Sequence, residues 1–90
     1  MKADRSYQCF LCDIPKGSAA IIEEIRLPKL FGDYLMRIGI EPGTVIRVSR
    51  ESPLGGPHIY LVQGTEIAIR RETARQILVR VTDFPGAEDA

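Results

Sequence analysis

Turn residues recur so closely along this chain that they leave room mainly for short elements. The 90 residues include eight Gly and six Pro, several of them adjacent, as in the segments 42–43 and 52–57. Glycine adopts the positive φ angles that tight turns need, and proline fixes φ at a value that suits them. Short apolar stretches between such turns favour strands over long helices. The sequence therefore predicts a mainly β fold, a small barrel of about five strands.

The expected strands are short and differ in how clearly they alternate. They are residues 19–25, 44–50, 58–62, 66–70 and 77–81, with a hairpin turn at 63–65. In 44–50, Ile46 and Val48 share one face, as a half-buried strand requires. In 19–25, Ile21 and Ile22 are adjacent, so this strand is either buried on both faces or shifted in phase by a bulge. A closed barrel would also remove the free edges of so small a sheet.

One segment, residues 28–38, has the apolar spacing of a helix. A stripe expected to face the core consists of Leu30, Tyr34, Leu35 and Ile38. Gly39 follows the last turn, where a left-handed residue closes a helix, and Ile40 is expected to fold back onto that turn. A single further helical turn is expected at 71–76.

Charge and length exclude several classes of protein. Lys and Arg together number 12, as do Asp and Glu, so the formal net charge is zero. Proteins that hold nucleic acid through its phosphates usually carry a basic excess, so no nucleic-acid partner is expected. No apolar stretch approaches the length of a membrane span, and the start of the chain is polar. We expect one cytoplasmic domain over 1–90, ordered at about 9–83, with loose ends that include 84–90.

Six arginines concentrate in the second half of the chain: Arg47, Arg50, Arg70, Arg71, Arg75 and Arg80. A basic stripe on one face of a barrel would suit RNA or an acidic protein surface. Aromatic residues that would stack on bases are scarce nearby, with Tyr60 the candidate. We therefore expect a solvated face that Glu51, Glu66 and Glu72 balance.

Cys9 and Cys12 form a Cys-x-x-Cys pair, which is half of a metal site. Two thiolates at this spacing can share Zn²⁺ or Fe²⁺, but a closed tetrahedral site needs two more ligands. The chain has a single histidine, His58, and no second cysteine pair. Three interpretations stay open: a four-thiolate site across a dimer, a small apolar pair with one thiol packed at the barrel end and one exposed, and, less favoured without a βαβ pattern, a redox pair.

Catalysis has little support in the sequence. His58 is expected at an exposed strand edge without a neighbouring nucleophile. No Gly-rich loop with Lys is present to cradle a nucleotide phosphate, so GTP binding is not expected. Glu23, Glu24 and Asp13 are candidates for direct Fe²⁺ binding. However, adjacent strand residues face opposite sides, so a solvated surface is expected instead.

The order of these signals carries a family resemblance. The chain contains Leu11-x-Asp13-Ile14-Pro15-x-Gly17, then Leu35-x-x-Ile38-Gly39-Ile40-x-Pro42-Gly43-Thr44, then Ser52-Pro53-Leu54-Gly55-Gly56-Pro57, and Ile67-Ala68-Ile69-Arg70-Arg71-Glu72-x-Ala74. Together, over about residues 11–81, they resemble the FeoA family of bacterial ferrous iron transport. The resemblance implies an SH3-like barrel that is not an enzyme and requires no cofactor. It also implies docking on the GTP-binding cytoplasmic part of the membrane ferrous iron transporter, an FeoB-type protein, which is then the chain's only link to the membrane.

Two surfaces are expected to bind that partner. The first is the loop residues Pro53, Leu54, Gly55 and Gly56, because loops on a rigid barrel commonly carry recognition. Leu54 either protrudes from this loop or caps the barrel end. The second surface is Phe31 and Met36, which lie off the helical core stripe. The alternative function is metal binding or sensing through Cys9 and Cys12. Self-association of the chain is left open.

Overall fold

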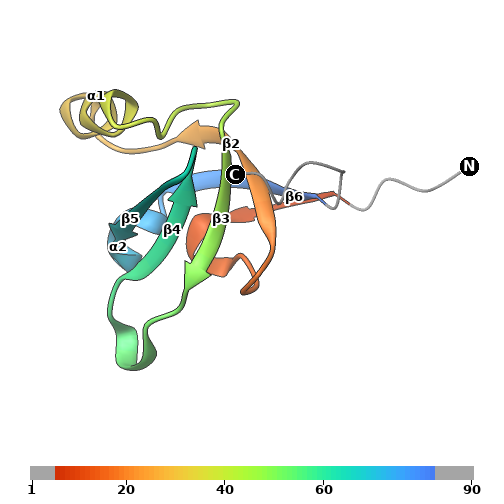
Figure 1. Cartoon of the computed structure of the whole chain (residues 1–90). Helices are drawn as coiled ribbons and strands as arrows, with labels where there is room; N and C mark the ends of the chain where they lie inside the picture. The colour runs from red at the N-terminus through yellow and green to blue at the C-terminus, as the bar shows by residue number, and fades with distance from the viewer. Residues whose placement is uncertain (1–5, 83–90) are drawn as a thin grey trace, which may run out of the picture.

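The computed structural model describes residues 6–82, in which six antiparallel strands form one curved sheet (Figure 1). The strands are β1 (Tyr7–Phe10), β2 (Ala19–Ile25), β3 (Val45–Arg50), β4 (His58–Val62), β5 (Thr65–Ile69) and β6 (Ile77–Thr82). The helices are α1 (Lys29–Arg37) and α2 (Arg71–Ala74), with 3-10 turns η1 (Leu11–Asp13) and η2 (Pro53–Gly55). The predicted tail at 84–90 and the last residue of the predicted core, Asp83, lie outside the described residues.

The sheet has the order β1-β6-β2-β3-β4-β5, so β1 and β5 are its two edges. Strand β1 is an element that the sequence analysis missed. Its register runs from Tyr7 opposite Val81 to Phe10 opposite Leu78. Among the described residues the hydrogen-bonded ladder does not close between β5 and β1. The expectation that closure removes the sheet edges is therefore wrong.

Strand β2 contains the bulge that the sequence left as one of two alternatives. Against β6, Ile22 lies opposite Val79, whereas Glu24 already lies opposite Leu78. Glu23 is the extra residue, and the phase shift lets Ile25, three residues after the buried Ile22, also pack against the core. Ile21 and Ile22 precede the bulge and lie on opposite faces by ordinary alternation, with Ile21 half-buried.

Helix α1 ends as its sequence predicts. Gly39 has a φ of +99°, its N–H donates to the carbonyl of Met36 at 3.1 Å, and the N–H of Ile40 donates to that of Leu35 at 2.9 Å. This pair of bonds is a Schellman motif, which satisfies the last carbonyls of the helix. Ile40 is fully buried, so the end of α1 is fixed to the core.

The core lies on the concave side of the sheet. Its largest fully buried side chains are Tyr60, Leu11, Ile22, Ile40, Ile46, Ile77, Val62 and Val79. The predicted core stripe of α1 is largely wrong: Leu35 is buried, but Leu30 is 84% exposed and Tyr34 is 51% exposed. The reason is visible in Figure 1, where α1 stands at one end of the sheet instead of lying inside its curve.

Candidate functional site

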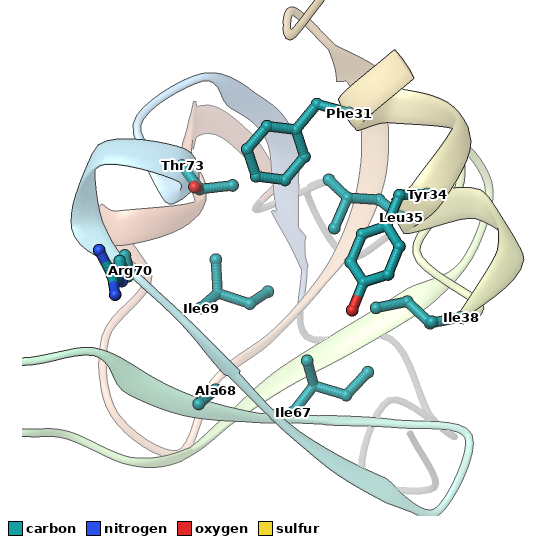
Figure 2. Close-up of a pocket in the computed structure, with 9 residues that line it drawn as sticks. All are labelled: Phe31, Tyr34, Leu35, Ile38, Ile67, Ala68, Ile69, Arg70 and Thr73. Atoms are coloured by element: carbon teal, nitrogen blue, oxygen red, sulfur yellow. The ribbon is translucent and has the colours of Figure 1, made fainter. Parts of the chain in front are cut away.

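An open apolar groove of about 200 Å³ lies between α1 and β5 (Figure 2). Its lining residues are Phe31, Tyr34, Leu35, Ile38, Ile67, Ala68, Ile69, Arg70 and Thr73. Figure 2 shows Phe31 and Tyr34 on the helix side, opposite Ile67 and Ile69 of the strand. Helix and strand thus present apolar side chains to each other across a space that is open to solvent.

The helical wall of the groove follows from the apolar spacing of α1. Tyr34 and Ile38 are four residues apart, so they lie on one face of the helix. Leu35 is buried and anchors this face to the core, while Phe31, Tyr34 and Ile38 keep 37–51% of their surface exposed. Large apolar side chains gathered at a surface usually mark an interaction site.

The strand wall comes from β5, an edge strand that pairs only with β4 among the described residues. Ile67 and Ile69 alternate with the exposed Ala68, as the two-residue period of a strand requires. Arg70 follows directly and lines the end of the groove. No acidic side chain within residues 6–82 is paired with Arg70.

Of the two α1 residues that were predicted to bind the partner, one lies in the groove. Phe31 lines it, whereas Met36 is exposed but does not line it. The predicted exposure of both side chains is confirmed, and their role in binding stays a prediction. The groove itself escaped the sequence analysis, because Ile67 and Ile69 were identified only as part of the expected strand 66–70 and of a family motif.

The predicted loop lies at the opposite end of the molecule from α1, as Figure 1 shows for residues 52–57. Leu54 is completely exposed and has a φ of +60°, so of the two alternatives it protrudes. Gly55 has a φ of +81°, and a Cβ on Gly56 would lie 2.6 Å from Oγ of Ser52. Two glycines therefore shape the loop that presents Leu54, and the structure does not bring this loop together with Phe31 and Met36.

Cys9 and Cys12 are free, half-buried and packed against the core. Burial raises the pKa of both thiols, and the carboxylate of Asp13 raises it further. Metal ligation needs thiolates, so these surroundings oppose it. Within residues 6–82, no three or more His, Cys, Asp or Glu side chains are grouped to hold a metal ion.

The prediction that His58 lies exposed at a strand edge is wrong, because its side chain is only 6% exposed. Strand β4 lies between β3 and β5, so its first residue is not at a sheet edge. Nε2 of His58 lies 3.3 Å from the guanidinium of Arg71. Since a guanidinium only donates, Nε2 is the acceptor of this contact. Cys12, Glu51 and Lys16 share a polar pocket of about 410 Å³ with this pair.

The arginines that were considered as a basic stripe make separate contacts. Arg50 forms an ion pair with Glu66 at 3.4 Å, in agreement with the prediction that glutamates balance the arginines. Nη1 of Arg47 donates a hydrogen bond to the carbonyl of Gly17 at 2.9 Å. Nε of Arg80 lies 2.9 Å from Glu23. Glu23 and Glu24, two of the carboxylates considered for Fe²⁺, are likewise engaged, because Glu24 pairs with Arg26 at 3.2 Å. Arg47, Arg50 and Arg80 are therefore engaged by partners within the described chain.

The chain is similar in sequence and in structure to known proteins. The family model described as the FeoA domain matches residues 10–81. A crystal structure described as an iron uptake regulatory protein, FeoA, is 28% identical, with a TM-score of 0.76 over 83% of this chain and 99% of that one. The FeoA protein of Chlorobium tepidum is 25% identical, with a TM-score of 0.76 over 87% and 76%. No curated protein sequence matches the chain.

A third solved structure bears on the fold alone. The FeoA of Stenotrophomonas maltophilia, described as an SH3 domain protein complexed with zinc, is 23% identical, with a TM-score of 0.68 over 78% of this chain and 87% of that one. The prediction of a small, mainly β, SH3-like fold is confirmed. Neither helix described within residues 6–82 has the length and apolar character needed to cross a bilayer.

Proposed function

The chain belongs to the FeoA family, and from this membership we propose that it is a non-catalytic accessory protein of bacterial ferrous iron transport. It acts in the cytoplasm, where it docks on the GTP-binding cytoplasmic part of the membrane ferrous iron transporter. The transport setting is supported by the description of one similar structure as an iron uptake regulatory protein, FeoA.

The observation that carries the docking proposal is the exposed apolar groove between α1 and β5. Phe31, Tyr34 and Ile38 are large side chains that the core does not cover. Each further 100 Å² of apolar surface that a partner covers contributes roughly 2.5 kcal/mol before the costs of association. A partner that covers this groove therefore gains from contacts that the isolated chain leaves to water.

Two features support a role without catalysis. The raised pKa of Cys9 and Cys12 reduces the thiolate fraction that a nucleophile needs. The imidazole of His58 is buried and in contact with Arg71, so it is poorly placed to take a proton from a substrate.

The test is a binding titration of the full chain against the detergent-solubilised transporter of the same cell, with GDP and with a non-hydrolysable GTP analogue. Saturable binding is expected with at least one nucleotide. Phe31→Asp is expected to weaken it by about tenfold or more, because a charge enters the groove. Leu30→Asp is the matched control, since Leu30 is on the same helix but outside the groove. Absence of binding with both nucleotides would overturn the proposed function.

A further inference from the structure

Strand β5 has a backbone edge that faces away from the sheet. The hairpin loop to β4 consists of Gln63 and Gly64, both with positive φ, and places Val62 opposite Thr65. Residues that flank a two-residue loop exchange hydrogen bonds, and such pairs alternate along an antiparallel ladder. Ile67 and Ile69 therefore bond to β4, as Thr65 does. The N–H and C=O groups of Glu66 and Ala68 point outward.

The apolar groove runs along this outward edge. Ala68 lines the groove between Ile67 and Ile69, and its small side chain leaves room for a second backbone to approach. Across the groove stand the side chains of Phe31 and Tyr34 on α1 (Figure 2). The site thus combines free backbone donors and acceptors with an apolar wall, which together suit an extended peptide.

The two ends of the edge differ in charge. At the hairpin end, the carboxylate of Glu66 is engaged by Ser49 at 2.9 Å and by Arg50 at 3.4 Å. At the other end, the exposed Arg70 has no acidic partner within residues 6–82. An acidic side chain from outside would neutralise this guanidinium in bidentate geometry.

We propose that an extended segment of the transporter's cytoplasmic part adds to β5 as a further strand. Its backbone bonds to Glu66 and Ala68, one of its apolar side chains enters the groove beside Phe31, and one of its acidic residues pairs with Arg70. This inference rests on the proposed function, because it names the mode of that docking. Main-chain bonds supply affinity in such strand addition, while the groove and Arg70 supply specificity.

The first test measures amide hydrogen exchange of the full chain, alone and saturated with the solubilised transporter. Exchange at Glu66 and Ala68 is expected to slow by about tenfold or more, because amides bonded between strands are protected. Ile67 and Ile69, already bonded to β4, serve as internal reference amides. Side-chain docking alone would leave Glu66 and Ala68 exchanging at the free rate, and that result would overturn strand addition while docking itself stands.

The other outcomes are equally decisive. If the wild-type chain does not bind the transporter, the proposed function fails and the inference falls with it. If Glu66 and Ala68 become protected in the chain alone as its concentration rises, a second copy occupies the edge. That outcome would overturn the assignment of the transporter segment.

Two substitutions test the parts of the site separately. Ala68→Pro removes an outward N–H but no bond to β4, so the fold should persist, as an unchanged circular dichroism spectrum would verify, while binding weakens by about tenfold or more. Arg70→Glu should weaken binding to a similar extent. Arg75→Glu is its control, since Arg75 is exposed and outside the groove. Equal weakening by both charge reversals would overturn the pairing with Arg70.

Discussion

The carboxylate of Glu23 accepts a hydrogen bond from Nε of Arg80 at 2.9 Å, at the position where β2 bulges against β6. The same carboxylate accepts a second bond from Nε2 of Gln8 on β1, at 2.6 Å. One side chain therefore connects three neighbouring strands. The extra residue of the bulge is what supplies it.

This arrangement predicts a pH dependence of stability. The hydrogen bonds from Gln8 and Arg80 lower the pKa of Glu23 below its ordinary value of 4.5. A lowered pKa in the folded state gives stability that is present above the unfolded value and lost as pH falls through the folded one. Glu23→Gln should therefore lower the Tm at pH 7. The difference in Tm between this variant and the wild-type protein should become smaller below pH 4.5.

Thermal unfolding followed by circular dichroism across this pH range checks the prediction. Glu24→Gln is the matched control, because Glu24 pairs with Arg26 on the surface and should have a small effect. A gap between Glu23→Gln and wild type that stays constant with pH would contradict the proposed linkage.

Two glycines of the helical segment should respond to alanine in opposite directions. Gly39 has a φ of +99°, so Gly39→Ala should destabilise the protein by about 1–2 kcal/mol. Gly32 lies inside α1, and a Cβ there would meet Cγ2 of Ile25 at an ordinary 3.8 Å. Gly32→Ala should therefore stabilise by up to about 1 kcal/mol. Urea unfolding gives both values, and shifts of the same sign would refute the prediction.

A substitution at Leu54 can test docking on the transporter without changing the stability of the fold. Because its side chain is fully exposed, Leu54→Asp should change the free energy of unfolding by no more than about 0.5 kcal/mol. If the loop contacts the transporter, the same change should weaken binding by about tenfold. Leu54→Asn, which tolerates the left-handed conformation, is the control for backbone strain. If Leu54→Asp leaves both fold and docking unchanged, the loop is not a contact surface.

The two thiols should react slowly. Since burial and the carboxylate of Asp13 raise the pKa of Cys9 and Cys12, their alkylation by iodoacetamide at pH 8 should be slower than that of free cysteine. Asp13→Asn should lower both pKa values and speed the reaction, whereas Asp33→Asn, remote on α1, should not. Mass spectrometry of the alkylated chain measures both rates.

Metal analysis of the untagged protein tests the alternative function. A single chain supplies two thiols without further grouped ligands in residues 6–82, so we expect no stoichiometric Zn²⁺ or Fe²⁺ after purification. Retained metal that Cys9→Ser/Cys12→Ser removes, together with a dimer in solution, would instead support a four-thiolate site between two chains.

The elements that could be predicted are those fixed by bonds between near neighbours. The positive φ of Gly39 and the bond from Ile40 to Leu35 depend on one helical turn, and the turn at Pro42-Gly43 closes between Glu41 and Thr44. Strand β1 could not be found in this way. Its pairing partner β6 lies about seventy residues further along the chain, and Tyr7 and Gln8 carry no alternating pattern of their own.

Predictions about which side of an element is buried failed where packing between distant segments decides it. The periodicity of α1 shows one apolar face, but it does not show that Tyr34 and Ile38 border a groove instead of the core. His58 shares a face of β4 with the buried Tyr60 and Val62, and its burial depends on the segments that pack against that face. The groove needs β5 beside α1, and nothing local in Ile67-Ala68-Ile69 encodes that.

The pairing of Tyr7 with Val81 has a practical consequence for handling this molecule. Strands β1 and β6 pair side by side, and in Figure 1 the labelled end of β6 lies away from both α1 and the loop at residues 52–57. A fluorescent reporter or an affinity tag joined directly before Tyr7 or after Val81 would leave the sheet away from both candidate surfaces. The same geometry suits grafting: residues 7–81 would insert into a host protein as a cassette whose entry and exit points coincide.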